Sequence, residues 1–258
     1  MRLIQGLLSV ALLTFVTGGV LAAPAANKPR PKISPELRAA LEKLKLPGVK
    51  INLEEWCVDV ESSVCLETGT LELIACIKDS KEHESVVVVE AKPSHIHTAL
   101  LLIGAKAGNP AMRKPIDKES MRFVDLPPRG GAIDVFLVVK DESGKEVEKP
   151  ISAFLTRAEH YSGRPHDDEE EDQDFPTHTF LYAGSILHGG GGEGEKPRTY
   201  VCDRSGNVIS ISTFGDELLC LPGIHAHANG ALMWEIKPDS LPKVGTKVTL
   251  RLRPKIKK

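Results

Sequence analysis

Alternation of apolar and polar residues dominates the chain and predicts a protein built mainly from β-strands. In such a stretch every second side chain is apolar, which places one face of the strand against a core. We expect the segment 78–84 to be the loop of a hairpin, and Gly144 to form the turn of another. The strands predicted from the pattern cover residues 49–53, 58–64, 71–76, 85–90, 132–140, 145–148, 177–184, 199–203, 208–213 and 246–252.

Two segments show the apolar spacing of a helix. The first begins at residues 34–36, where Ser34 can cap the helix, and ends at residues 47–48, a Pro-Gly pair. The second covers residues 93–103 and is almost entirely apolar, so we expect the sheet to bury it. The predicted fold class is therefore α+β: a β-rich single domain with a buried central helix and a flanking N-terminal helix.

The N-terminus has the features of an export signal. Arg2 precedes an apolar run of about 14 residues, and the small residues Val20 and Ala22 suit cleavage after Ala22. We interpret residues 1–22 as a signal peptide, 23–33 as a flexible linker and 34–258 as the folded domain. A membrane-spanning helix needs about 20 apolar residues, and no segment after the signal peptide has them. We therefore expect a secreted or periplasmic protein with no transmembrane segment in the mature chain.

Composition excludes several classes of function. Hydrophobic residues make up 41% of the chain, and 33 Lys and Arg residues nearly balance 35 Asp and Glu residues. A disordered chain would be less apolar, and a nucleic-acid-binding protein would carry clustered basic residues, so we expect no nucleic-acid partner. Composition does not define the partner, although export would allow another envelope protein.

Two unusual segments are predicted to be loop insertions. Residues 166–174 are strongly acidic but lack the ligand spacing of a calcium loop. Residues 189–194 are rich in glycine but lack the lysine and the strand–turn–helix context of a phosphate-binding loop. Neither segment therefore predicts a ligand.

Five cysteines follow the predicted signal peptide, and an oxidising compartment would allow them to pair. We expect disulfides between Cys57 and Cys65 and between Cys202 and Cys220, each across a short reversing segment. This pairing leaves Cys76 without a partner. The alternative is that all five are small buried hydrophobic residues.

The strongest candidates for chemistry come from consecutive predicted elements. Cys76 ends a strand, His83 and Glu84 lie in the following loop, and His95 and His97 begin the apolar helix. A thiolate with imidazoles suits zinc or copper, and a Cys–His pair would also suit a nucleophile. On a helix His95 and His97 point in nearly opposite directions, so they are poor ligands of one ion. The alternative is that these histidines only satisfy backbone groups.

A second His-x-His motif, formed by His225 and His227, would share one face of a strand and could bind one metal ion. The sequence contains no Gly-x-Ser-x-Gly elbow and no His-Glu-x-x-His helix. We therefore expect a non-enzymatic ligand- or metal-binding module of the bacterial envelope, with zinc or copper as the cofactor hypothesis. A metal- or Cys/His-dependent hydrolase and a structural envelope protein are the alternatives.

Several runs resemble the YdjY-type domain of exported bacterial proteins. The most specific are Lys81-Glu-His-Glu-Ser85 and the Pro-Ser-x-x-His-x-Ala-Leu-Leu run that begins at Pro93. Residues 180–185, Trp234 and residues 241–250 also fit, so the resemblance extends over about residues 49–254. It implies a type of domain and export, and it implies no mechanism. An iron–sulfur cluster would need closely grouped cysteines, which this sequence lacks.

Overall fold

The computed structural model describes residues 34–117, 122–158, 174–190, 198–226 and 233–255. The predicted signal peptide and linker, nearly all of the acidic loop and His227 lie outside these ranges, so the predictions on them remain predictions. Residues 34–258 form one compact unit. None of the helices in the described ranges is long and apolar enough to cross a membrane.

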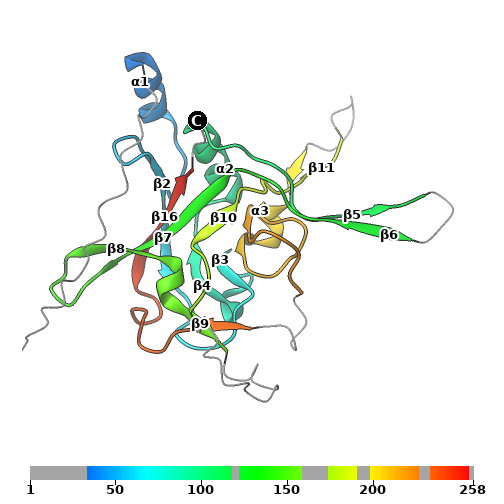
Figure 1. The fold of residues 1–258 in the computed structure, drawn as a ribbon. Coiled ribbons are helices and arrows are strands. Elements are labelled where there is room, and N and C mark those ends of the chain that lie inside the picture. The colour runs from blue at the N-terminus through cyan, green and yellow to red at the C-terminus, as the bar shows by residue number, and fades with distance from the viewer. Residues whose placement is uncertain (1–33, 118–121, 159–173, 191–197, 227–232, 256–258) are drawn as a thin grey trace, which may run out of the picture. The chain divides into compact units, whose positions relative to one another are not determined.

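Eight of the described strands close into a barrel (Figure 1). Each strand is hydrogen-bonded to the next, and β4 pairs back with β2 through Ser62 opposite Val89. A barrel of eight strands has an interior just wide enough to be filled by side chains. The order around it is β2 (Cys57–Val64), β16 (Lys247–Pro254), β7 (Ala132–Lys140), β10 (Thr179–Leu181), β14 (Leu219–Cys220), β13 (Asn207–Ser210), β3 (Leu73–Ile77) and β4 (Ser85–Val89).

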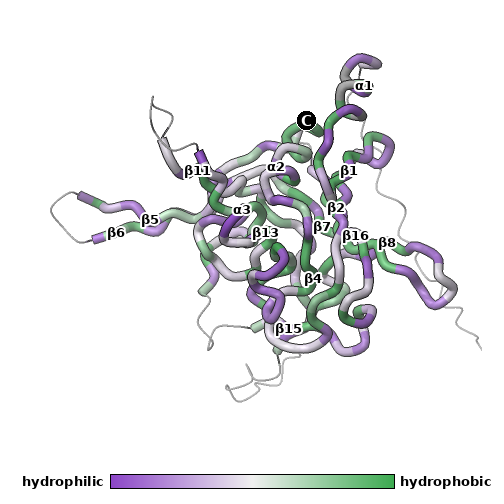
Figure 2. Tube along the Cα trace, turned by 180° about the vertical axis from the view of Figure 1, so that it is seen from behind, coloured by the Kyte–Doolittle hydropathy of each residue, from purple (hydrophilic) through white to green (hydrophobic). Residues whose placement is uncertain are grey.

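The alternation in the sequence corresponds to alternate burial in the barrel. Along β7, the side chains at positions 133, 135, 137 and 139 are buried and those between them are partly exposed. β2 and β16 repeat this pattern beside it. Figure 2 shows the apolar residues gathered along the barrel strands. The strand predicted over residues 132–140 is confirmed at both ends, because one of its faces is buried and the other is not.

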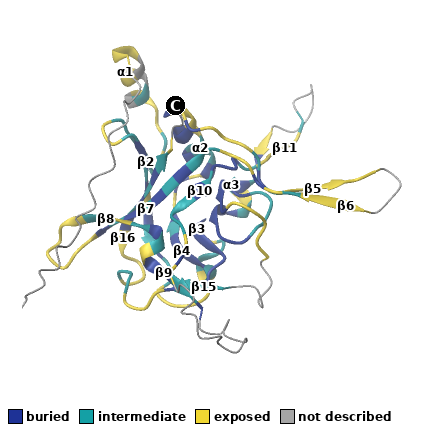
Figure 3. Cartoon of the chain, in the orientation of Figure 1, coloured by how far each residue is buried: buried dark blue, intermediate teal, exposed yellow. Residues whose placement is uncertain are grey.

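Further strands extend the barrel or form small sheets of their own. β1 (Val49–Asn52) pairs with β2, and β8 (Glu146–Pro150) pairs with β7. Figure 3 shows the hairpin of β5 (Met112–Pro115) and β6 (Phe123–Leu126) as an exposed arm. The pattern did not predict most of these strands, because they are short. The described small sheets pair β5 (Met112–Pro115) with β6 (Phe123–Leu126), β9 (Leu155–Arg157) with β15 (Trp234–Ile236), and β11 (Leu187–His188) with β12 (Thr199–Tyr200).

Both predicted helices are present, as α1 (Pro35–Lys43) and α2 (Pro93–Leu102). The α+β class with a buried central helix is not confirmed, because the closed barrel supplies its own core. α2 packs against β1 and β2 with one side only, and Leu101 and Leu102 remain 46% and 39% exposed. The domain is therefore a β-rich barrel with few helices in its described part. A one-turn helix, α3 (Cys202–Ser205), replaces the end of a predicted strand.

The hairpin predicted between residues 71–76 and 85–90 is wrong. β3 and β4 are parallel neighbours, with Leu73 beside Ser85 and Ile77 beside Val89. Strands joined by a tight hairpin are antiparallel, so residues 78–84 must instead run back along the sheet. This crossover contains the 3-10 helix η1 (Glu82–Glu84). A second 3-10 helix, η2 (Ile151–Phe154), follows β8.

Candidate functional site

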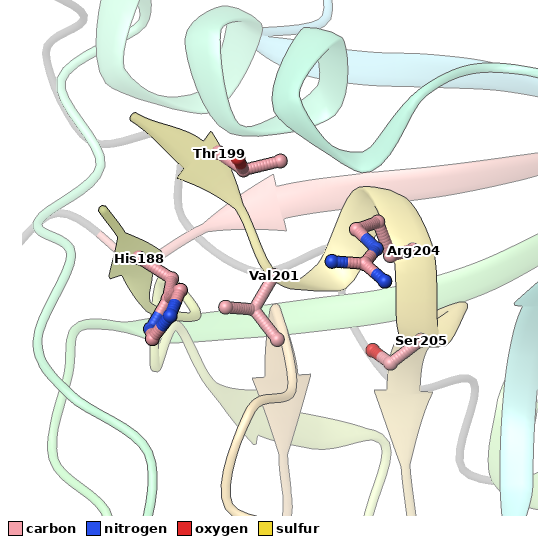
Figure 4. Close-up of a pocket in the computed structure, with 5 residues that line it drawn as sticks. All are labelled: His188, Thr199, Val201, Arg204 and Ser205. Carbon is pink, nitrogen blue, oxygen red and sulfur yellow. The ribbon is translucent and has the colours of Figure 1, made fainter. Parts of the chain in front are cut away.

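A hollow of about 440 Å³ lies where β11, β12 and α3 meet (Figure 4). Its size is within the range of small-molecule sites, about 300 to 1,000 Å³. We call it the pocket, and residues 199–205 the pocket segment. The side chains that line the pocket are His188, Thr199, Val201, Arg204 and Ser205.

Local backbone geometry places these side chains around one space. β11 and β12 pair with His188 opposite Thr199. Alternate residues of a strand face opposite sides, so Thr199 faces the pocket while Tyr200 is buried. α3 follows and ends at Gly206, whose φ of 79° is left-handed and favours glycine. In Figure 4 the guanidinium of Arg204 points to the side where Val201 and His188 lie.

The polar groups of the pocket are basic or hydroxyl-bearing. Arg204 is exposed, and no carboxylate of the described residues forms an ion pair with it. The Ser205 Oγ is buried and has no hydrogen-bond partner in the described ranges. The neighbouring carboxylate of Asp203 binds Ser94 instead. The pocket therefore offers the N–H donors and positive charge of Arg204 to a ligand.

Asp203 connects the pocket segment to α2. Its two carboxylate oxygens accept hydrogen bonds from the backbone N–H of Ser94, at 2.8 Å, and from the Ser94 hydroxyl, at 2.7 Å. The first N–H groups of a helix have no partner within the helix, and Lys92 at the N-cap supplies no side-chain acceptor. A residue 109 positions further along the chain thus caps α2.

His97 lies between two tyrosine rings behind the pocket segment. Its ring centroid is 5.4 Å from that of Tyr182 and 5.1 Å from that of Tyr200. The Tyr182 hydroxyl lies 2.7 Å from His97 Nδ1 and 2.9 Å from the His97 carbonyl oxygen. A hydroxyl has one hydrogen, so both hydrogen bonds form only when Nδ1 carries a proton and Tyr182 donates to the carbonyl. Burial lowers the pKa of His97, which favours the neutral ring with an unprotonated Nε2.

The loop after β10 is bound to the pocket segment from the other side. The Tyr200 hydroxyl donates to the Gly184 carbonyl at 2.6 Å, and the Cys202 N–H donates to the Ser185 Oγ at 3.2 Å. Gly184 has a φ of 83°, and a Cβ there would lie 3.0 Å from the Cβ of Ala107. Glycine is required because any side chain would meet both strain and a close contact. Two segments of the YdjY-like pattern, residues 93–101 and 180–185, therefore meet behind the pocket.

The predicted grouping of Cys76 with the histidines is not found in the structure. The His83 side chain is 78% exposed and its Nε2 lies 3.7 Å from a Glu84 oxygen, whereas Cys76 is fully buried. α2 has begun before His95, so His95 and His97 lie about 200° apart around its axis. The Nδ1 of His95 is buried without a partner in the described ranges. Among the described residues no three His, Cys, Asp or Glu side chains are placed to hold a metal ion.

The second His-x-His motif is only half described. His225 is exposed, and its Nε2 lies 2.8 Å from the Pro222 carbonyl oxygen. Its backbone N–H donates to the Thr213 hydroxyl at 2.8 Å. His227 lies outside the described residues, so their action as a metal-binding pair remains a prediction.

All five cysteines are free thiols, which corrects both predicted disulfides. Cys57 begins β2 and Cys65 follows its last residue, so at about 3.3 Å per residue their Cα atoms lie about 26 Å apart. A disulfide needs Cα atoms within about 7 Å. The Cys202 thiol donates to the Asn207 carbonyl at 3.0 Å and is not bonded to Cys220. Proximity in the sequence was a poor guide because β2 is fully extended.

The pocket residues were not predicted from the sequence. Residues 204–207 fall between the predicted strands 199–203 and 208–213, and His188 precedes the glycine-rich run without belonging to a motif. An Arg-Ser pair is too common to indicate a site by itself. Only the pairing of β11 with β12 brings His188 close to the segment that carries Arg204.

The fold and the site define the class: a β-barrel domain with a side pocket that carries the exposed guanidinium of Arg204. The family model of the YdjY domain matches residues 49–253, so the chain belongs to the YdjY domain family, which confirms the resemblance. Searches of curated proteins and of solved structures gave no match.

Proposed function

We propose that this protein is a non-enzymatic binding module that takes a small anionic ligand, with a carboxylate or phosphate group, in the pocket. The observation that carries the proposal is the free guanidinium of Arg204, with no acidic partner among the described residues. His188 lies beside it as a further polar residue of the lining. A guanidinium binds both kinds of anion through two parallel hydrogen bonds, which supports an anionic ligand over a neutral one.

The nucleophiles near the pocket favour binding over hydrolysis. The Cys202 thiol is buried, and burial raises its pKa well above the usual range, so the thiolate is disfavoured. The Ser185 hydroxyl donates to the Asp216 carbonyl at 2.6 Å and not to a histidine. A nucleophile needs an adjacent base or a lowered pKa, and neither residue has one in the described part of the chain.

Export is part of the proposal, and its support is the apolar run before Ala22. The protein would then act in the periplasm or outside the cell. N-terminal sequencing of the protein recovered from outside the cytoplasm should begin at or near Ala23. Recovery of the full chain from the cytoplasm alone would contradict export.

A titration followed by nuclear magnetic resonance tests the ligand. Isotope-labelled mature chain is titrated with inorganic phosphate and, separately, with citrate, while backbone amides are observed. We expect saturable shifts at residues 201–205 with at least one anion. Arg204→Gln removes a charged hydrogen bond worth about 1.5 to 3 kcal/mol, so affinity should fall by about 10- to 150-fold.

The matched control is Arg113→Gln, which removes the same charge from the exposed β5–β6 arm. Arg113 is 73% exposed and pairs with Asp125 at 3.2 Å, so its loss should leave affinity unchanged. Shifts that do not saturate with either anion, or an equal loss of affinity in both variants, would overturn the proposal.

A further inference from the structure

The hairpin of β5 and β6 projects from the barrel and carries apolar side chains into solvent (Figure 1). We call its described part, residues 112–117 and 122–126, the arm. Every residue of β5 and β6 is exposed except Leu126, which is half-buried. Exposed apolar side chains that gather in one place mark an interaction surface. Of the eleven large hydrophobic residues exposed in the described ranges, four lie on the arm: Met112, Ile116, Phe123 and Val124.

The root of the arm is held firmly on the barrel. Asn109 and Arg129 exchange two backbone hydrogen bonds of 2.9 Å. The Gly108 N–H donates to the Tyr182 carbonyl at 2.9 Å. A Cβ on Gly130 would lie 2.1 Å from the same carbonyl oxygen, so only glycine permits this approach. A rigid root thus holds out a strand pair that packs on no core, although such a pair alone is at best marginally stable in water.

The register of the hairpin sorts its side chains into two faces. Directly opposite residues of an antiparallel pair share a face, and successive residues of a strand alternate between faces. Lys114 lies opposite Val124. The Ile116 N–H donates to the Arg122 carbonyl at 3.0 Å, so these two are also opposite. One face therefore combines apolar with cationic side chains, and we call it the cationic face: Met112, Lys114, Ile116, Arg122, Val124 and Leu126.

The charges of the two faces differ. On the opposite face, the Arg113 guanidinium pairs with Asp125 at 3.2 Å and lies 5.6 Å from the centre of the Phe123 ring. On the cationic face, Lys114 and Arg122 are exposed, and no carboxylate of the described residues forms an ion pair with either. Two uncompensated positive charges thus lie among exposed apolar side chains, which suits a partner that is both anionic and apolar.

The size of the cationic face does not suit a folded protein partner. Five residues of each strand span about 17 Å, and two strands about 5 Å apart cover a width of about 10 Å, so the face measures about 170 Å². A stable interface between proteins buries about 800 Å² on each partner. A second copy placed face to face would also bring Lys114 and Arg122 against like charges. A bilayer needs no complementary shape, since headgroups and acyl chains adapt to the side chains that enter them.

We infer that the arm docks this protein on the surface of a bilayer that contains anionic phospholipid. The apolar side chains of the cationic face enter the boundary between headgroups and acyl chains, and Lys114 and Arg122 pair with lipid phosphates. Binding is reversible, because a few apolar side chains bury far less area than a membrane-spanning helix. The inference goes beyond the proposed function, since the arm carries no residue of the pocket.

Co-sedimentation of the mature chain with vesicles tests the inference. One set of vesicles is phosphatidylcholine alone, and the other contains about 30% phosphatidylglycerol, so that its surface is anionic. We expect the protein to sediment with the anionic vesicles and to stay in the supernatant with the neutral ones. Salt at about 1 M shortens the screening length to about 3 Å and should release most of the bound protein. Equal binding to both sets, or binding to neither, would overturn the inference.

Charge variants assign the binding to the cationic face. Lys114→Gln and Arg122→Gln should each weaken binding to the anionic vesicles about fivefold, since each removes one cation from the lipid surface. The matched control is Lys140→Gln, which removes the same charge from the exposed end of β7, away from the arm in Figure 1. Its affinity should equal that of the wild type, and an equal loss in all three variants would contradict a role of the arm.

An apolar position tests insertion separately from charge. Ile116→Asp places a carboxylate where the side chain enters the lipid and should weaken binding at least about tenfold. Val244→Asp is the control, because Val244 is 55% exposed, close to the 54% of Ile116, and lies outside the arm. Both positions are exposed, so both variants should fold, and their equal melting temperatures check this. Equal binding by the two variants would contradict insertion.

Two further measurements separate the other occupants. Arg204→Gln should sediment with the anionic vesicles as the wild type does. If it alone loses binding, the headgroup binds in the pocket and the arm has no part in docking. Sedimentation velocity without vesicles should show a monomer. A dimer that Ile116→Asp dissociates would assign the cationic face to a second copy and overturn the inference.

Discussion

Replacing Tyr182 with phenylalanine tests whether the contact with His97 stabilises the region behind the pocket. The substitution removes one oxygen atom and keeps the ring, which is fully buried. The lost hydroxyl makes two hydrogen bonds, one with His97 Nδ1 at 2.7 Å and one to the His97 carbonyl at 2.9 Å. Because the ring still fills its space, no large cavity forms, and the effect should come from the hydrogen bonds alone.

The two hydrogen bonds should contribute unequally. The His97 carbonyl lies inside α2 and keeps its hydrogen bond within the helix, so losing the hydrogen bond from Tyr182 to this carbonyl costs little. The Nδ1 proton loses its partner, and an unsatisfied buried donor costs about 1 to 3 kcal/mol. We therefore expect the free energy of unfolding to fall by about 2 kcal/mol. For a domain of this size the melting temperature should fall by about 4 to 8 °C.

Urea unfolding, followed by the fluorescence of Trp56 and Trp234, measures this loss. Tyr200→Phe is the matched control, because among the described residues its hydroxyl makes a single hydrogen bond, to the Gly184 carbonyl. Removing that one neutral bond should cost about 1 kcal/mol. A loss below about 0.5 kcal/mol for Tyr182→Phe, the range of ordinary surface substitutions, would refute the proton assignment on His97.

Three further changes test neighbouring contacts. Burial lowers the folded-state pKa of His97 below its unfolded value of about 6.5. The contribution of the neutral ring to the free energy of unfolding is therefore full above pH 6.5 and declines as pH falls toward the folded pKa. Urea unfolding at pH 5, 6 and 7 should show this decline, and His97→Gln should reduce it. Gly184→Ala should cost about 1 to 3 kcal/mol in unfolding free energy, because backbone strain adds to a contact of 3.0 Å between the new Cβ and that of Ala107. Gly144→Ala is the control and should cost less, since Gly144 has a similar φ but open space around it. Asp203→Ala should cost about 1 kcal/mol and speed amide exchange at Ser94, since it removes the cap of α2; unchanged exchange would contradict that role.

The sequence pattern predicted strands well where one face is buried and the other is not. β7 is such a strand, and its limits were found because its alternation is long and regular. The pattern does not predict whether neighbouring strands are parallel or antiparallel, because the alternation with a period of two residues is the same in both. The crossover between β3 and β4 was therefore mistaken for a hairpin, and barrel closure could not be foreseen. α3 was missed because the alternation through Tyr200 and Cys202 continues across a one-turn helix.

The candidate sites depend on contacts that sequence spacing does not report. A disulfide between Cys57 and Cys65 was predicted because they are eight residues apart, yet the extended strand β2 holds them at its two ends. Arg204 and His188 come to the same pocket only through the pairing of β11 with β12, which has two residues in each strand. The expectation that His95 and His97 diverge agrees with the structure, since it rests on helix geometry alone.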